Sequence, residues 1–166
     1  MTKEQFASLQ LKRKIDMARR KPLAIILDLD GTLCNCEHRV HFMRERPKRR
    51  DEFHSACVFD SVIASTKALV DMAEEKGIKV ILLSARPLRF KPQTESWLEQ
   101  NKIHYDQLIL SGHPELSDPE FKLKMYRELI EPFYEILFAV DDRDIVVNMW
   151  RENAITCFDI AGNHFS

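Results

Sequence analysis

Short runs of apolar residues alternate along this chain with longer stretches in which apolar residues recur every three or four positions. The short runs are typical of strands buried on both faces of a parallel sheet, and they predict strands at residues 23–27, 78–84, 107–111, 135–140 and 155–160. The longer stretches predict helices at residues 60–76, 91–102, 119–130 and 144–153, and Gly77 suits the C-terminal cap of the first helix. This alternation predicts an α/β fold, a Rossmann-like three-layer sandwich whose parallel sheet is covered by helices on both faces.

A basic amphipathic stretch precedes this alternation. Residues 3–20 have the apolar spacing of a helix, and Pro22 separates them from the first strand. The candidate core contacts of this helix are Phe6, Leu9, Ile15 and Met17. We therefore expect an N-terminal basic helix over residues 1–22 and one α/β domain over residues 23–166.

Polar side chains gather where three of the predicted strands end. They are Asp28 and Asp30 after the first strand, Ser84 and Arg86 at the end of the second, and Asp141, Asp142 and Arg143 after the fourth. The carboxyl ends of parallel strands form the edge at which such sheets bind ligands. The sequence therefore predicts one polar site that is built from three separate stretches and contains four carboxylates.

This set of residues has a definite chemistry. Four carboxylates in one place repel one another, so the arrangement is stable only if a cation lies among them. An all-oxygen site with few protein ligands suits Mg²⁺, which retains several waters and binds phosphate oxygens. Four side chains at this edge can donate hydrogen bonds to a phosphate: Thr32, Ser84, Arg86 and Arg143. One acid can attack phosphorus while its neighbour two residues on transfers the proton of the leaving group.

The stretch DLDGT at residues 28–32 carries a family resemblance. It resembles the first signature, D-x-D-G-T, of the haloacid dehalogenase (HAD) superfamily of phosphohydrolases, and the serine, lysine and acidic-pair signatures follow in order. Within this superfamily, the chain is most similar to the 3′-phosphatase domain of the polynucleotide kinase–phosphatases of T-even bacteriophages. The stretches LLSARP and AVDDRDIVVNMWRENAITCFDIAGNHF carry that similarity, which covers about residues 23–165.

The resemblance implies roles for the residues at the strand ends. Asp28 matches the nucleophile that becomes an aspartyl phosphate, and Asp30 matches the general acid–base that also offers its backbone carbonyl to Mg²⁺. Ser84 matches the hydroxyl that holds the phosphoryl group. Asp142 matches the metal-binding acid of the last signature, with Asp141 beside it.

The same resemblance implies four further site residues. Lys122 matches the family's lysine by its spacing to the fourth strand, and Lys124 is its rival if the alignment slips by two residues. Asp118 lies one helical turn before Lys122, where it can orient the lysine. Arg39 and Arg86 match two arginines of the family, so both are expected to bind substrate together with Thr32, Asp118 and Arg143.

The chain also departs from the family pattern. Ala85 replaces the glycine before the second-motif arginine, which matters only if the backbone needs a positive φ there. No G-x-x-x-x-G-K-[ST] phosphate loop is present, so we expect these residues not to include the kinase half of such enzymes. The gaps at residues 34–77 and 87–118 leave no room for a large cap domain, and an open site can admit a strand end.

The charge is distributed unevenly. Residues 1–50 hold 13 Lys and Arg against 6 Asp and Glu, whereas residues 51–166 hold 12 against 20, which suggests an anionic partner. From Arg39 to Arg50 there are six bases and only one acid, and the segment 44–52 lies at the end of this basic stretch. It is either a solvated face or a basic lip that follows a nucleic-acid backbone.

The cysteines and the hydropathy limit the remaining possibilities. Four cysteines are compatible with free thiols in a reducing cytoplasm, and no apolar run is long enough to span a bilayer. A zinc site would use Cys34, Cys36, His38 and His41, but their spacing is too tight for paired zinc knuckles.

We interpret the chain as a cytoplasmic, Mg²⁺-dependent phosphohydrolase that acts on a polynucleotide 3′-phosphate. One alternative is a phosphatase of nucleoside monophosphates or other small esters. An alternative of another class is a non-catalytic module that binds phosphorylated ends, which would require a missing nucleophile or metal ligand, and none is missing. The sequence leaves the oligomeric state open.

Overall fold

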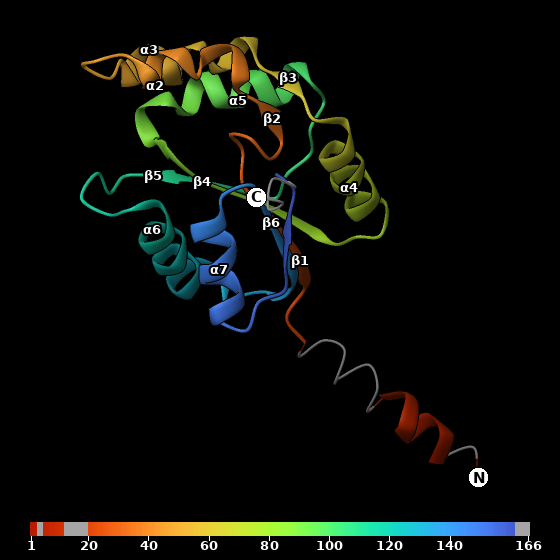
Figure 1. Cartoon of the computed structure of the whole chain (residues 1–166). Coiled ribbons are helices and arrows are strands. Elements are labelled where there is room, and N and C mark those ends of the chain that lie inside the picture. The colour runs from red at the N-terminus through yellow and green to blue at the C-terminus, as the bar shows by residue number, and fades with distance from the viewer. Residues whose placement is uncertain (3–4, 12–19, 162–166) are drawn as a thin grey trace.

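The computed structural model describes residues 1–2, 5–11 and 20–161 of the chain. Its central feature is a five-stranded sheet in which all neighbouring strands run parallel. In spatial order the strands are β5 (Gln107–Ser111), β4 (Lys79–Pro87), β1 (Leu23–Leu27), β6 (Glu135–Asp141) and β7 (Cys157–Asp159) (Figure 1). Because β1 lies between β4 and β6, the three strands that end in polar residues are direct neighbours. The predicted parallel sheet is confirmed.

Helices cover both faces of this sheet (Figure 1). One face carries α6 (Asp118–Met125), the π-helical turn η4 (Tyr126–Ile130) and α7 (Asp144–Glu152), and the other carries α4 (Ala64–Glu75) and α5 (Lys91–Gln100). The alternation of side chains along β1 divides its apolar run between two cores. Ala24 and Ile26 pack with α6 and α7, whereas Ile25 and Leu27 pack with α4 and α5. The three-layer arrangement follows from this two-sided burial.

A small insert connects β1 to α4. It consists of β2 (Cys34–Asn35), η1 (Glu37–Arg39), α2 (His41–Arg44), α3 (Arg50–Ser55), η2 (Ala56–Phe59) and β3 (Ser61–Val62). β2 and β3 pair with each other, and η2 packs against α5 (Figure 1). The indole N–H of Trp97 on α5 donates a hydrogen bond of 2.8 Å to the backbone oxygen of Asp60. The insert is built of short elements, in agreement with the expected absence of a large cap domain.

Several predicted elements differ from the structure at their boundaries. Two of these differences adjoin the insert or the site residues. The helix predicted at residues 60–76 begins only at Ala64, because β3 pairs with β2 just before it. Its end is as expected: Gly77 has φ +68°, and Ile78 N donates to Ala73 O at 2.9 Å, which closes a Schellman cap. The strand predicted at residues 78–84 continues as β4 to Pro87, past the site residues that it carries.

The N-terminal prediction is tested only in part. Residues 5–11 are helical, but the predicted core contacts Phe6 and Leu9 are wrong, because both side chains are exposed. Ile15 and Met17 lie outside the described residues. The division of the chain into two units at residue 22 remains a prediction.

Two further expectations concern membrane and redox chemistry. Across the ranges that the structure describes, no helix has both the length and the apolar character that crossing a membrane requires. All four cysteines have free thiols, as predicted.

Candidate active site

The chain turns sharply directly after β1, at Gly31. The backbone N–H groups of Leu33 and Cys34 both donate to the carbonyl oxygen of Leu29, at 2.9 and 3.0 Å, which closes this turn. Gly31 has φ +84°, and a Cβ at this position would lie 2.2 Å from Oδ2 of Asp142. Glycine is therefore required both for the backbone conformation and for the close approach of Asp142.

Three carboxylates meet beside this turn. Asp28 extends from β1, and Asp141 and Asp142 stand at the end of β6, with one oxygen of each lying within 4.8 Å of the others. Asp28 and Asp141 are buried, and Asp142 is partly exposed. We call these three residues the acid cluster. The structure thus brings together three of the four acids that the sequence placed at this edge.

A buried lysine contacts the acid cluster. Nζ of Lys122 on α6 lies 2.7 Å from Oδ2 of Asp141 and 3.3 Å from Oδ2 of Asp28. Burial would lower the pKa of Lys122, but the charges of Asp28 and Asp141 outweigh it and raise the pKa above its usual range. The lysine is therefore protonated. Its rival Lys124 instead pairs with Glu128 at the surface, at 2.6 Å, so Lys122 is the lysine at the cluster.

The acid cluster has the properties of a cation site. Burial raises the pKa of Asp28 well above its usual range, although Lys122 acts in the opposite direction. Burial and the charge of Asp141 raise the pKa of Asp142 to about 6. Oδ1 of Asp28 is buried without a hydrogen-bond partner. A divalent cation would give this oxygen a partner and would favour the ionised carboxylates, so the residues present fit Mg²⁺.

Two further residues predicted at this site connect to Lys122. Asp118, one turn before it on α6, lies 3.4 Å from its Nζ through Oδ1. Nη1 of Arg143 donates to Oδ2 of the same Asp118 at 2.8 Å. Asp118 therefore bridges the buried lysine and a half-exposed arginine.

The hydroxyl residues lie on either side of β1. Thr32 is buried, and its Oγ1 donates to Oδ1 of Asp142 at 3.2 Å. Ser84 on β4 is also buried, and its Oγ accepts the backbone N–H of Arg86 at 3.4 Å. Ala85 has no positive φ, so the replacement of the family's glycine does not strain the backbone.

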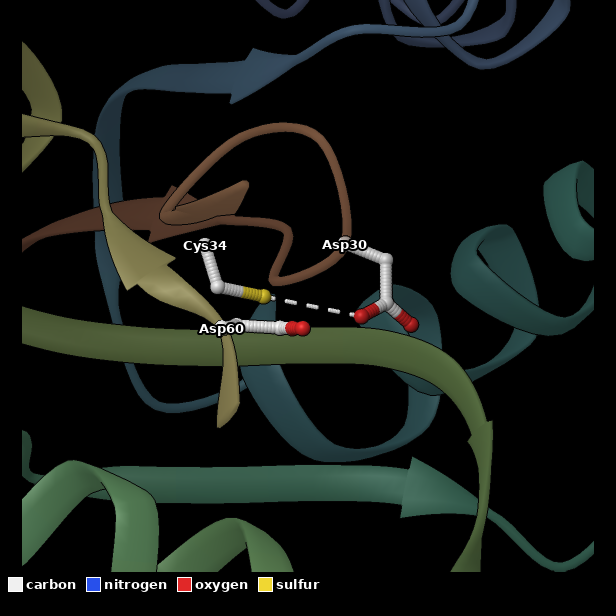
Figure 2. Close-up of side chains that lie close together, drawn as sticks. All are labelled: Asp30, Cys34 and Asp60. Carbon is white, nitrogen blue, oxygen red and sulfur yellow. Dashed lines mark hydrogen bonds between the residues drawn. The ribbon is translucent and has the colours of Figure 1, made fainter. Parts of the chain in front are cut away.

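The side chain of Asp30 lies in a second cluster, away from the other three acids. Nη2 of Arg39 and Nη2 of Arg86 both donate to its Oδ1. Figure 2 shows Asp30, Cys34 and Asp60 with their polar atoms turned toward one another, and the Cys34 thiol is 3.5 Å from Oδ1 of Asp30. The expectation that four carboxylates surround one cation is therefore wrong for the Asp30 side chain. Two guanidinium groups neutralise it instead.

The two arginines are held firmly in this second cluster. Arg39 donates from Nε and Nη2 to Asp60, at 2.8 and 2.6 Å, and Nη1 of Arg86 donates to Oγ1 of Thr94 at 2.9 Å. Burial would raise the pKa of Asp30, but the charges and hydrogen bonds of Arg86 and Arg39 hold it well below its usual range. Asp30 is therefore ionised, and Nε of Arg86 remains buried without a partner.

In the part of the chain that the structure describes, the residues of the zinc alternative do not form a metal site. His38 is 2.7 Å from Asp60 through Nε2, and His41 contacts the backbone oxygen of His38. The Cys34 thiol donates to Leu29 O at 3.2 Å. These residues therefore have separate partners, and the described chain forms no group of three or more of them that could hold a metal.

A cleft of about 430 Å³ opens at the ends of β4 and β5. Ala85, between Ser84 and Arg86, lines it, so the cleft adjoins the edge of the sheet that carries these two residues. Its polar wall consists of Arg50 and His54 from α3, Arg89 from η3 (Leu88–Phe90), and His113. Burial lowers the pKa of His54 to about 4, so His54 is neutral at pH 7 and adds no charge to that of Arg50 and Arg89. This cleft is one place where a substrate can extend from the acid cluster.

Sequence reasoning missed Asp60 and Thr94. Both are buried partners of the predicted site arginines. One signal pointed toward Asp60: two arginines next to a single Asp30 need a further buried acid.

Comparisons with known proteins agree with this geometry. Residues 22–165 match a family model described as the polynucleotide kinase PNKP phosphatase domain. The chain is 33% identical to a chain of the Pnkp1/Rnl/Hen1 complex, with a TM-score of 0.75 over 86% of this chain and 47% of that one. A second structure of that assembly, described as an RNA repair complex, also has 33% identity and a TM-score of 0.75, over 84% of this chain and 42% of that one.

Two more distant similarities concern a viral protein and a bacterial phosphatase. A protein of Autographa californica nuclear polyhedrosis virus, assigned as a bifunctional polynucleotide kinase/RNA ligase, is 25% identical over 146 residues, which are 86% of this chain and 20% of that protein. A class C acid phosphatase from Bacillus anthracis shares the fold at 19% identity, with a TM-score of 0.61 over 82% of this chain and 58% of that one. The chain thus spans less than half the length of the kinase relatives that it matches.

Proposed function

The chain belongs to the family of polynucleotide kinase PNKP phosphatase domains within the HAD phosphatases, and from this premise we propose that it is a Mg²⁺-dependent polynucleotide 3′-phosphatase. As a member of this family it is a phosphoric monoester hydrolase. The observation that supports the proposal most directly is the acid cluster, in which Asp28 stands beside Lys122 with one carboxylate oxygen free of hydrogen bonds.

Asp28 is the proposed nucleophile. One of its carboxylate oxygens attacks phosphorus, a new P–O bond forms, and the bond from phosphorus to the 3′-oxygen of the sugar breaks. Lys122 stabilises the negative charge that spreads over the phosphoryl oxygens. A water molecule then hydrolyses the aspartyl phosphate, which releases inorganic phosphate and restores Asp28.

Asp30 is the proposed acid–base group. It gives a proton to the leaving 3′-oxygen and takes one from the attacking water in the second step. In the free protein its contacts with Arg39 and Arg86 keep it ionised. An incoming phosphate shares the guanidinium of Arg86, whose Nε lacks a partner, and this weakens the hold on Asp30 and favours its protonation.

Mg²⁺ is the proposed cofactor, and when bound it neutralises phosphate charge and favours the ionised form of the nucleophile. Asp28, Asp141, Asp142 and the backbone carbonyl of Asp30 would hold it. Ser84 and Thr32 are placed to donate hydrogen bonds to the phosphoryl group or to position the acids.

The polynucleotide substrate is supported by the cleft beside β4 and β5. Arg50 and Arg89 provide positive charge for backbone phosphates, which would compete with Asp51 for the guanidinium of Arg89. The exposed side chain of Leu88 provides an apolar surface for a base. The similarity to a chain of an RNA repair complex makes RNA ends one substrate class to test.

The test compares phosphate release from 3′-phosphorylated oligonucleotides of DNA and RNA, 5′-phosphorylated oligonucleotides and nucleoside 3′-monophosphates. We expect turnover of the 3′-phosphorylated strands that requires Mg²⁺ and disappears in Asp28→Asn with the fold intact. Arg50→Ala/Arg89→Ala should raise KM for oligonucleotides by on the order of 10-fold and leave the mononucleotide unaffected. Arg127→Ala on η4 removes a surface arginine away from the cleft and is the matched control.

Two outcomes would contradict the proposal. Preference for mononucleotides, with no effect of the arginine variants on strands, would identify a small-ester phosphatase. Undiminished activity of Asp28→Asn would refute the assignment of the nucleophile.

A further inference from the structure

We infer that His54 determines which sugar the phosphatase prefers: its imidazole donates a hydrogen bond to the 2′-hydroxyl of the sugar that carries the 3′-phosphate. Ends with a ribose are then preferred to ends with a deoxyribose. This inference rests on the proposed function, because it concerns the substrate of that reaction. His54 lies on α3 in the insert and lines the cleft beside β4 and β5.

Two aromatic rings fix the position of His54 next to the second cluster. The centroid of its ring lies 5.1 Å from that of Phe53 and 5.3 Å from that of Phe90. The ring of Phe53 also lies 4.2 Å from the guanidinium carbon of Arg39, which donates from Nη2 to Asp30. His54 is therefore held close to Asp30, the proposed acid–base group.

The protonation state of His54 follows from its burial and from neighbouring charges. Burial lowers the pKa of His54 to about 4, although the charge of Asp30 acts in the opposite direction. The guanidinium groups that lower this pKa further are those of Arg86, Arg39 and Arg89. The imidazole is therefore neutral at pH 7 and carries a single N–H.

This single proton lies on Nε2. Nδ1 of His54 is buried, and within the residues that the structure describes it has no hydrogen-bond partner. An N–H at Nδ1 would be a buried donor without an acceptor, and the neighbouring guanidinium groups favour a lone pair there. Nε2 is the polar atom of the ring that remains accessible, so His54 offers the cleft one neutral N–H donor.

A neutral donor at this place suits the sugar of the substrate. Arg50 and Arg89 already provide charge for phosphates on the same wall, and an uncharged imidazole adds none. In the proposed reaction Asp30 acts on the 3′-oxygen, so the part of the substrate nearest to His54 is the sugar itself. Beside this 3′-oxygen, RNA has a 2′-hydroxyl that can accept a hydrogen bond, whereas DNA has only hydrogen.

The test uses oligonucleotides that differ only in the sugar at the 3′-phosphorylated end, which is ribose or 2′-deoxyribose. A ribose also changes the leaving group, so the decisive quantity is how a substitution changes the ratio of the two kcat/KM values. His54→Phe keeps a ring between Phe53 and Phe90 but has no N–H. We expect it to lower the ribose-to-deoxyribose ratio about 3- to 10-fold, the effect of one neutral hydrogen bond, by slowing the ribose end.

Two further variants and the pH dependence are the controls. His54→Gln keeps an amide N–H and should retain part of the preference for ribose. His104→Phe makes the same replacement at a half-exposed histidine whose Nδ1 lies 3.5 Å from Glu74, and it should leave the ratio within about 2-fold of the wild type. Because His54 is neutral throughout, the wild-type ratio should be constant from pH 6 to pH 8.

A binding measurement tests the contact without turnover. In Asp28→Asn, the ¹⁵N signal of the His54 Nε2, identified by its absence in His54→Gln, should shift more with a ribonucleoside 3′-phosphate than with the deoxyribonucleoside 3′-phosphate. Equal shifts with both ligands would overturn the inference.

Two kinetic results would also overturn it. Equal losses for both sugars in His54→Phe would show that the ring only supports the cleft, and a ratio that rises as the pH falls toward 6 would show that a charged imidazole acts. If His54→Phe fails to fold, His54→Gln and the binding measurement still decide the point. A wild type without phosphatase activity on either end would end the proposed function, whereas the ¹⁵N shifts would still test the contact.

Discussion

Replacing Asp142 by Asn should stabilise the metal-free protein at neutral pH and weaken its response to Mg²⁺. Asp142 lies against the turn at Gly31 and beside Asp141, in a partly buried position. Burial and the charge of Asp141 raise its pKa from 3.8 to about 6. The amide oxygen of Asn can still accept the hydrogen bond from the Thr32 hydroxyl, and Asn has no charge that must be buried.

The sign and size of the effect follow from this shift. An acid whose pKa is raised by folding binds its proton more tightly in the folded state, so the folded state loses stability as pH rises from about 4 to about 6. A shift of this size corresponds to about 3 kcal/mol, and solvent screening of the partly exposed carboxyl group reduces it to about 1–2 kcal/mol. Asp142→Asn should therefore gain that much relative to the wild type between pH 4 and pH 7 when metal is chelated.

The assay is urea unfolding of both proteins from pH 4 to pH 7, with EDTA or with excess Mg²⁺. The comparison must be a difference between variants, because the pKa of His54 is lowered to about 4 and acts with the opposite sign in the same pH range. Mg²⁺ at about 100 times its Kd should stabilise the wild type by about 2.7 kcal/mol and the variant by far less. A pH-independent difference, or equal stabilisation of both proteins by Mg²⁺, would refute the reasoning.

Three further substitutions test the site. Lys122→Met keeps the buried volume but leaves the carboxylates without their ammonium, so phosphate release should fall at least about 100-fold in a steady-state assay. Gly31→Ala puts a methyl group against Asp142 and should abolish the Mg²⁺ response, whereas Gly77→Ala, which shares a positive φ but meets no neighbour, should only lower stability in a thermal melt by about 1–2 kcal/mol. In Arg86→Lys a single ammonium group cannot replace both guanidinium contacts, with Thr94 and with Asp30, so kcat should fall on the order of 10-fold. A kcat equal to that of the wild type would argue against a role of Arg86 in the reaction.

Much of the sheet could be predicted because its strands are buried on both faces. The run from Ala24 to Leu27 supplies both cores, and such a run has few other structural solutions. The polar residues at the carboxyl ends of β1, β4 and β6 then place Asp28, Ser84 and Asp141 at one edge of the sheet from sequence alone.

The insert could not be predicted in the same way. Its elements are only two to six residues long, so no apolar period develops over them. The direction of the Asp30 side chain was also beyond the sequence, because the turn at Gly31 breaks the strand alternation that would have placed it beside Asp28. The buried partner Asp60 comes from this same insert, and only the structure links it to Arg39.

The tie between Arg39 and Asp60 has a consequence for protein engineering. A chimera that exchanges residues 34–62 between relatives must move both ends of this tie as one unit, because a mismatched pair would bury an unbalanced charge next to Asp30. The outer part of the insert is more permissive, since Arg49 forms its ion pairs at the surface with Glu45 and Glu52. Libraries that aim at a new specificity for nucleic-acid ends should therefore randomise the exposed turn before α3. They should leave the buried residues of the insert, Arg39 and Asp60, unchanged.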